Sequence, residues 1–204
     1  MAFLGFLGPG DRDKRHPFFS RKRRNRWDGR WILPLLLGGF VCVLPARAQS
    51  KEYQLKAAFL YNFVQFVEWP PGAFPSSDAP LRIGILGDDP FGGALDEAIQ
   101  NESVGNHRLT VVRSSNIADL QDCQMIFVSE SEEGHLGEIL SAIDSKPVLT
   151  VSDIDHFAQS GGDIGFFLSD GKVRFAINPG SAKQSGLRIS SQLLTLGRIV
   201  GGGN

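Results

Sequence analysis

The sequence predicts an α/β protein: a three-layer sandwich in which helices cover a mostly parallel sheet, with one antiparallel hairpin strand near the C-terminus. Two observations predict this class. Between residues 81 and 153, short runs of Val, Ile, Leu and Phe alternate with helix-like stretches, as in right-handed βαβ units with buried strands. Over residues 164–178, Asp170 and Gly171 separate two further apolar runs, which is the signal for a two-residue hairpin turn.

The first predicted element of the folded domain is an amphipathic helix over residues 51–68. Apolar side chains recur there at helical rather than alternate spacing, at Leu55, Ala58, Phe59, Tyr61, Phe63, Val64, Phe66 and Val67. The helix is expected to stop at Trp69, because the following Pro70 disfavours a helical backbone in the residue before it. A polar loop over residues 75–80 comes next.

Alternating strands and helices follow this loop. Strands are predicted over residues 81–87, 108–114, 123–130 and 147–153, and helical stretches over residues 90–101, 115–122 and 134–145. We interpret Asp88, Asp89 and Pro90 as a turn and as the N-cap of the next helix. A phosphate-accepting receiver domain also has an acidic pair at this place, but the strand over residues 123–130 lacks the Asp that a receiver needs at its end.

Two short helices are expected after the hairpin. Asn178 is in position to cap a helix over residues 179–186, which begins with a proline. Ser190 or Ser191 can cap a last helix that runs to Val200.

Residues 1–48 have the pattern of a cleaved secretory signal peptide, which leaves residues 49–204 as a single domain. Ten Lys and Arg against three Asp and Glu make this leader strongly basic, and an apolar stretch over residues 31–44 precedes the small-residue site Ala46-Arg47-Ala48. The alternative is an uncleaved membrane anchor, but about 14 apolar residues fall short of the roughly 20 that cross a bilayer. We therefore expect export to the periplasm.

The exported part is acidic and has one cysteine. It holds eleven Lys and Arg against nineteen Asp and Glu, a net charge of −8 that repels phosphate backbones, so nucleic acid is not expected as a partner. Cys42 is lost with the leader, which leaves Cys123 as the sole thiol and no internal disulfide. No His or Lys lies near Cys123 in the sequence, so we expect a small buried side chain rather than a reactive thiol.

The motifs of common cofactor sites and active sites are missing from the sequence. Its glycines match neither the dinucleotide-binding pattern nor the P-loop, and no serine lies in a nucleophile elbow. Three histidines outside the leader have no metal-ligand spacing and are expected at the surface: His107, His135 and His156. The sequence therefore predicts a protein without a cofactor, without a bound metal and without catalytic activity.

Polar and basic side chains lie among apolar ones near the C-terminus, and they form a candidate partner or ligand surface. Its residues are Arg174, Asn178, Arg188, Ser190 and Ser191, and Lys172, Lys183 and Arg198 add positive charge nearby. Arg174 and Arg188 could together clamp an anion at a helix N-terminus. The alternative is that these residues are exposed charges with no binding role.

The predicted N-terminal helix carries more aromatic side chains than one narrow core stripe can hold. Some of them, with Tyr61 and Phe66 as the candidates, are expected to form an exposed patch. An exposed apolar patch on a small acidic domain indicates a dimer or partner surface.

Five segments of the domain together resemble the YfiR family. They are KAAFLYNFVQFVEWP, GILGDDPFG, CQMIFVSE, GGDIGFFLSDGKVRFAIN and GLRISSQLLTLGRIV, which fall between about residues 53 and 200. The resemblance implies a periplasmic regulator that represses a membrane-bound diguanylate cyclase by binding the periplasmic region of that cyclase. It thereby implies control of cyclic-di-GMP signalling and biofilm formation, an OmpA-like outer-membrane lipoprotein that sequesters the repressor, and a tendency to form homodimers.

The chain departs from the resembled family in its cysteines. Characterised relatives have a disulfide from a cysteine at the place of Cys123, and the second cysteine is missing here. Redox control through that bridge is therefore in doubt for this chain.

A function of another class also stays open on the sequence. A periplasmic sensor could bind a small molecule at the C-terminal ends of the strands, around Asp88, Ser129 and Ser152, where doubly wound sheets hold their ligands.

Overall fold

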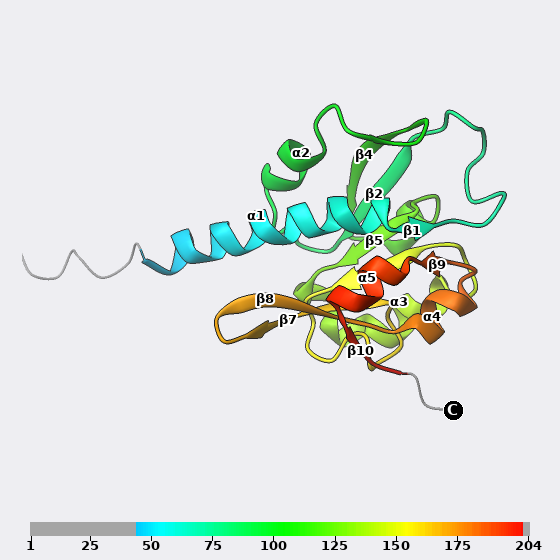
Figure 1. Cartoon of the computed structure of the whole chain (residues 1–204). Helices are drawn as coiled ribbons and strands as arrows, with labels where there is room; N and C mark the ends of the chain where they lie inside the picture. Colours follow the sequence, from blue (N-terminus) through cyan, green and yellow to red (C-terminus); the bar gives the residue numbers. More distant parts are fainter. Residues whose placement is uncertain (1–43, 202–204) are drawn as a thin grey trace, which may run out of the picture. The chain divides into compact units, whose positions relative to one another are not determined.

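The computed structural model describes residues 44–201, which fold into a mixed α/β domain with helices on both faces of a sheet (Figure 1). The predicted leader up to residue 43 lies outside the described residues. The α-helices are α1 Leu44–Gln65, α2 Ala94–Ile99, α3 Leu136–Ala142, α4 Pro179–Gln184 and α5 Ser191–Leu196, and the 3-10 helices are η1 Ile117–Leu120 and η2 Glu130–His135. None of the helices within residues 44–201 is both long and apolar enough to cross a membrane.

The main sheet has eight strands in the order β10-β8-β7-β6-β5-β2-β4-β3. Its strands are β2 Leu81–Leu86, β3 Ser103–Val104, β4 His107–Ser114, β5 Met125–Val128, β6 Leu149–Ser152, β7 Ile164–Ser169, β8 Lys172–Ile177 and β10 Arg198–Ile199. The five strands from β7 to β4 in this order are parallel, and β8 runs antiparallel to β7. This arrangement confirms the predicted three-layer fold with its reversed hairpin strand.

Two short edge strands and a second small sheet were not predicted. β3 pairs antiparallel with β4, and β10 pairs parallel with β8 at the opposite edge. The second sheet joins β1, Val67–Glu68, to β9, Arg188–Ile189, in antiparallel register.

The core is divided by the sheet into two layers. On one face, α1, α2, α4 and α5 pack against the sheet, and the fully buried Leu60 and Phe63 of α1 lie in the middle of this layer. On the other face, η1 and α3 cover the central strands, with Ile126 and Val128 of β5 beneath them. Residues along β5 alternate between the two layers, as expected for a strand that is buried on both sides.

The N-terminal helix ends earlier than predicted. It stops at Gln65, and Val67 and Glu68 instead form β1 against β9. Trp69 is held next to this strand by a hydrogen bond of 3.1 Å from its indole N–H to the carbonyl of Gln124. The pairing of β1 with β9 therefore ends the helix before Pro70, although the apolar residues continue at helical spacing up to Val67.

The turn after β2 is confirmed, but its role as a helix cap is wrong. The Asp89 carboxylate accepts a hydrogen bond of 2.7 Å from the backbone N–H of Phe91, which closes an Asx turn. Helix α2 begins only at Ala94, and its N-cap is Gly93, which has no side chain to serve as a cap.

The two C-terminal caps are confirmed. The Asn178 side chain accepts a hydrogen bond from Ser181 N–H at the start of α4, and Ser190 accepts one from Leu193 N–H at the start of α5. The last helix ends at Leu196 rather than Val200, because the chain after it pairs with β8 as β10.

Cys123 is buried as predicted, two residues before the start of β5. Its side chain lies against Gly84 of β2, where a Cβ would come within 3.2 Å of the sulfur atom. Burial raises the pKa of the Cys123 thiol to about 11, so the thiolate is scarce at neutral pH.

Replacing Leu60 by Ala should lower the free energy of unfolding by about 2–5 kcal/mol, because the side chain is fully buried between α1 and the sheet. The matched control is Asn62→Ala on the exposed side of the same helix, which should change it by less than about 0.5 kcal/mol. Urea denaturation measures both. Equal effects of the two substitutions would contradict the position of α1 on the sheet.

Candidate functional site at the hairpin end of the sheet

The β7–β8 hairpin extends beyond the rest of the sheet. β6 pairs with β7 only at Ile164 and Gly165, so the remainder of β7 is held by β8 alone on one side. Asp170 and Gly171 both have positive φ, 53° and 68°, as a type I′ turn requires, which confirms the predicted two-residue turn. Figure 1 shows the hairpin reaching out alongside the N-terminal half of α1.

One face of this hairpin carries clustered positive charge. The register places Arg174 opposite Phe167 and Lys172 opposite Ser169, so these side chains share the sheet face that is turned away from α1. Arg198 of β10 is opposite Ala176, two residues along β8 from Arg174, and therefore lies on the same face. We call Phe167, Lys172, Arg174 and Arg198 the cationic face.

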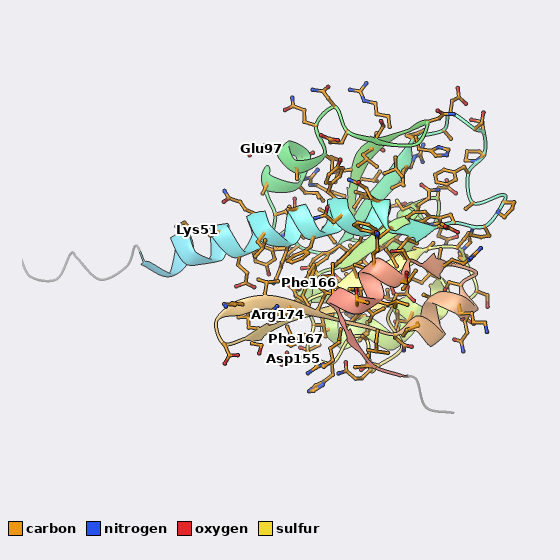
Figure 2. All side chains as sticks on the ribbon, in the orientation of Figure 1. Lys51, Glu97, Asp155, Phe166, Phe167 and Arg174 are labelled. Atoms are coloured by element: carbon orange, nitrogen blue, oxygen red, sulfur yellow. The ribbon has the colours of Figure 1, made fainter. Side chains whose placement is uncertain are left out.

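An aromatic ring lies at the centre of the cationic face. The guanidinium carbon of Arg198 is 4.2 Å from the centroid of the Phe167 ring, which is a cation–π contact. Figure 2 shows Phe166 nearer to α1, whereas Arg174 and Phe167 are labelled farther from α1, at the hairpin. All three cations are exposed, so their charge is available to a partner.

An apolar groove lies on the other side of the hairpin, between β8 and α1. It has a volume of about 560 Å³. Its apolar wall is formed by Leu55 of α1, Leu168 of β7 and Val173, which lies directly opposite Leu168. Charged residues complete the lining: Lys51 and Glu52 of α1, and Lys172 and Arg174 at the edge of β8. Leu55 and Leu168 are 46% and 60% exposed, which is unusual for large aliphatic side chains and indicates a contact surface.

A buried charge cluster fixes α1 to the sheet next to this groove. The Lys56 ammonium is 2.7 Å from a carboxylate oxygen of Asp153, which directly follows β6, and 2.7 Å from Glu52. The hydroxyl of Tyr53 donates a hydrogen bond of 2.8 Å to the same Asp153 oxygen. Burial and this hydrogen bond raise the pKa of the Tyr53 hydroxyl. We call Glu52, Tyr53, Lys56 and Asp153 the Lys56 cluster.

A second hollow, of about 470 Å³, lies beside the Lys56 cluster at the C-terminal ends of β5 and β6. Two exposed carboxylates, Glu130 and Asp155, line it together with the aromatic side chains of β7. The other Asp153 oxygen is buried without a hydrogen-bond partner. This hollow is therefore acidic, in contrast to the cationic face.

The place where the strand order reverses is filled by side chains. In the sheet, β4 lies on one side of β2 and β5 lies on the other side. The strand order therefore reverses between β2 and β5, at the C-terminal ends of these two strands. Ser131 accepts a hydrogen bond of 3.0 Å from Asp88 N–H, and a Cβ on Gly87 would collide with Ser131 and Glu132. Ser152 donates to the carbonyl of Val128 and accepts from Ile154 N–H, so its hydroxyl holds the backbone.

The aromatic residues proposed as an exposed patch pack against the core. Tyr61 donates a hydrogen bond of 2.6 Å to Glu102, which raises the pKa of its hydroxyl, and Phe66 is partly buried against the main core. The large exposed apolar side chains within residues 44–201 lie elsewhere: Leu55, Leu168, Leu196 and Ile199.

The structure separates the proposed C-terminal site residues. Asn178 and Ser190 serve as helix caps, and Ser191, the first residue of α5, is exposed. Arg188 is 3.7 Å from Glu68 beyond the C-terminus of α1, whereas Arg174 lines the groove with Leu55 in the middle of that helix. About 15 Å of helix separates Leu55 from the last residue of α1, so the two arginines do not form one anion clamp.

The position of Phe167 opposite Arg174 was not predicted from the sequence, although the turn could have revealed it. Counting outward from Asp170 and Gly171 places residue 167 opposite residue 174. No local signal would have placed Arg198 there, because β10 joins the sheet by a long-range parallel pairing.

The fold is that of an α/β domain that exposes charged and apolar side chains at one end of its sheet. A family model described as YfiR/HmsC-like matches residues 53–198, and the chain therefore belongs to this family, as predicted. The family is one of regulators.

Comparison with curated proteins gives no match. Among solved structures, the chain is similar to one described as the ABC domain in complex with L-Trp from Streptococcus pneumonia. The two share 12% sequence identity with a TM-score of 0.45, and the match covers 75% of this chain and 60% of the other.

Replacing Lys56 by Met should lower the free energy of unfolding by about 3–5 kcal/mol, because it leaves the buried Asp153 carboxylate without its cation. The double variant Lys56→Met with Asp153→Asn should recover most of this loss, since the amide can still accept the Tyr53 hydrogen bond. Urea denaturation of both variants measures the difference. A single variant as stable as the wild type would show that the ion pair is not buried.

The two tyrosines of the chain should titrate above their ordinary pKa of about 10. The folded protein then holds both hydroxyls protonated where the unfolded chain ionises, so stability is full below about pH 10 and falls as the pH rises above it. Glu102→Gln should bring Tyr61 back towards its ordinary pKa and leave Tyr53 unchanged. Tyrosinate absorbance follows both groups, and two unshifted titrations would refute the assigned contacts.

Proposed function

We propose that this protein is a periplasmic regulator that represses a membrane-bound diguanylate cyclase by contact with the cyclase's periplasmic region. It would thereby control cyclic-di-GMP signalling and biofilm formation. The observation that carries the proposal is the YfiR/HmsC-like match over residues 53–198, nearly the whole described domain.

The partner surface proposed for the cyclase is the cationic face and the neighbouring sheet edge. Lys172, Arg174 and Arg198 gather three exposed positive charges in a domain that is otherwise acidic. A local reversal of charge sign steers an acidic partner to one side of the molecule and disfavours binding elsewhere. The exposed Leu196 and Ile199 on the same edge add apolar area for a stable contact.

The regulatory cycle follows from competition for this surface. An OmpA-like outer-membrane lipoprotein that bound the repressor would withdraw it from the cyclase and release cyclic-di-GMP synthesis. A homodimer would present two such surfaces and strengthen the contact with a dimeric membrane protein through effective concentration.

Repression by contact needs no catalysis, and the reactive side chains are used in other ways. The Lys56 ammonium and the Asp153 carboxylate neutralise each other, and Ser152 is engaged with the backbone. Burial keeps Cys123 protonated at neutral pH.

A second candidate function is sensing of a small molecule, and the acidic hollow beside the Lys56 cluster favours it. Four carboxylates line this hollow against one cation, Lys56, so its charge would select a cationic ligand such as a small amine. The carboxylates are Glu52, Glu130, Asp153 and Asp155. Isothermal titration of the purified protein with small amines tests this candidate independently of any cyclase.

Deleting the gene should raise cellular cyclic-di-GMP, and restoring the wild-type protein should lower it again. The double variant Arg174→Glu with Arg198→Glu should fail to restore repression at normal protein level, because it reverses the charge of the cationic face. It should also fail to co-purify with the cyclase. Quantifying cyclic-di-GMP in cell extracts measures the effect.

The matched control is Lys183→Glu with Arg188→Glu, which reverses two exposed charges outside the cationic face. This variant should repress normally. The opposite ranking of the two double variants would move the contact to the Arg188 end of the molecule, and no response to deletion would refute the proposed function.

A further inference from the structure

We propose that the outer edge of β8 binds an extended segment of the partner protein in which apolar and acidic side chains alternate. The inference rests on the proposed function for the identity of the partner. The chemistry of the segment comes from the edge alone.

Part of the β8 edge has no strand beside it. β10 pairs with β8 only at Ala176 and Ile177, and no strand within residues 44–201 pairs with the outer side of residues 172–175. An unpaired edge presents a row of backbone N–H and C=O groups that an extended chain can bind.

The turn determines which of these groups point outward. In a two-residue hairpin, the two residues next to the turn form both hydrogen bonds with each other, and here they are Ser169 and Lys172. Hydrogen-bonded pairs alternate with non-bonded pairs along the strands, so the residue after Lys172 on β8 points its N–H and C=O away from β7. Val173 and Phe175 are therefore the outward residues. Because the pairing with β10 begins at Ala176, the outward carbonyl of Phe175 faces Arg198, and the groups that stay open are the N–H and C=O of Val173 and the N–H of Phe175. The same alternation makes Ile177 the next outward residue. Its carbonyl does point away from β7, because it accepts a hydrogen bond of 2.8 Å from the N–H of Val200.

An added strand would contact different chemistry on its two faces. On the α1 side, its side chains would contact the apolar wall of the groove, which is Leu55, Leu168 and Val173. On the other side they would meet Lys172, Arg174 and Arg198 of the cationic face. Because successive side chains of a strand point to opposite faces, the fitting segment alternates apolar and acidic residues.

A second copy of this chain does not fit the same edge. The β8 edge of another copy would place its own Lys172 and Arg174 next to those of the first, and like charges on adjacent strands repel each other. Basic residues at an edge suppress self-pairing in this way, but they attract a strand of opposite charge.

The test uses two capped peptides of equal length, one alternating Val with Glu and the other alternating Val with Lys, titrated into the purified exported protein. The Val-Glu peptide should bind at least tenfold more tightly than the Val-Lys peptide. It should also slow hydrogen exchange of the Val173 and Phe175 amides, while the Arg174 amide, already bonded to β7, should change little. A peptide with all its Val before all its Glu controls for composition.

Two variants separate the edge from a general charge effect. Val173→Pro removes one outward N–H and should abolish binding, whereas Val173→Ala keeps that N–H and should retain most of it. Lys172→Glu with Arg174→Glu should reverse the preference, so that the Val-Lys peptide binds more tightly. This reversal keeps the test valid if the proline variant does not fold.

Equal binding of the two peptides, unchanged exchange at Val173 and Phe175, or protection of these amides by self-association without peptide would overturn the proposal. The outcome is separable from that of the proposed function. Peptide selectivity without any cyclic-di-GMP response to deletion would support the edge site and refute the cyclase as partner. If the charge-reversed variants lose repression but the peptides do not bind the wild-type protein, the cyclase would be supported as the partner and the edge site refuted.

Discussion

The position of helix α1 on the sheet is the constraint on which the rest of the structure depends. Its central residues bury a continuous apolar surface against β2, β5, β6 and β7, with Leu60 and Phe63 fully enclosed. The helix is fixed at two separate points. The Lys56 cluster joins the middle of α1 to Asp153, which follows β6, and β1, which follows the last turn of α1, pairs with β9. The helix can therefore neither slide along the sheet nor rotate without burying an uncompensated charge.

The apolar groove is exposed because α1 and the β7–β8 hairpin extend beyond the neighbouring strands. β6 stops at Ser152, but β7 and β8 continue to their turn, and α1 continues over them. The space between α1 and the hairpin remains open as the apolar groove, since β10 is too short to close its outer side. Leu55 and Leu168 thus remain exposed because the neighbouring elements are short, although each lies on an element whose other side chains build the core.

Local patterns made most of the fold predictable, and long-range pairing accounts for the remainder. Buried strands, the Asp-Gly turn and the caps at Asn178 and Ser190 each depend on residues that are close in sequence, and these were predicted correctly. The strands β1, β9 and β10 have two residues each, and they exist only because distant segments meet. The same limit applies to the site. Arg174 was identified from composition, but its grouping with Arg198 depends on the position of β10, and the polar Asn178 and Ser190 proved to hold helix ends.

Charge has two separate uses in this domain, and burial distinguishes them. The ion pair of Lys56 and Asp153 is buried, so its attraction is hardly screened and its removal would cost stability rather than binding. The cationic face is exposed, so its charges add little to stability but act on an approaching partner over about 8–10 Å at physiological ionic strength. Residues 49–204 together carry a net charge of −8, so they would repel an acidic partner from most directions, and attraction at the hairpin alone would orient that partner before contact. Salt weakens such steering while it leaves the buried cluster intact, so binding at this face should depend on ionic strength far more than folding does.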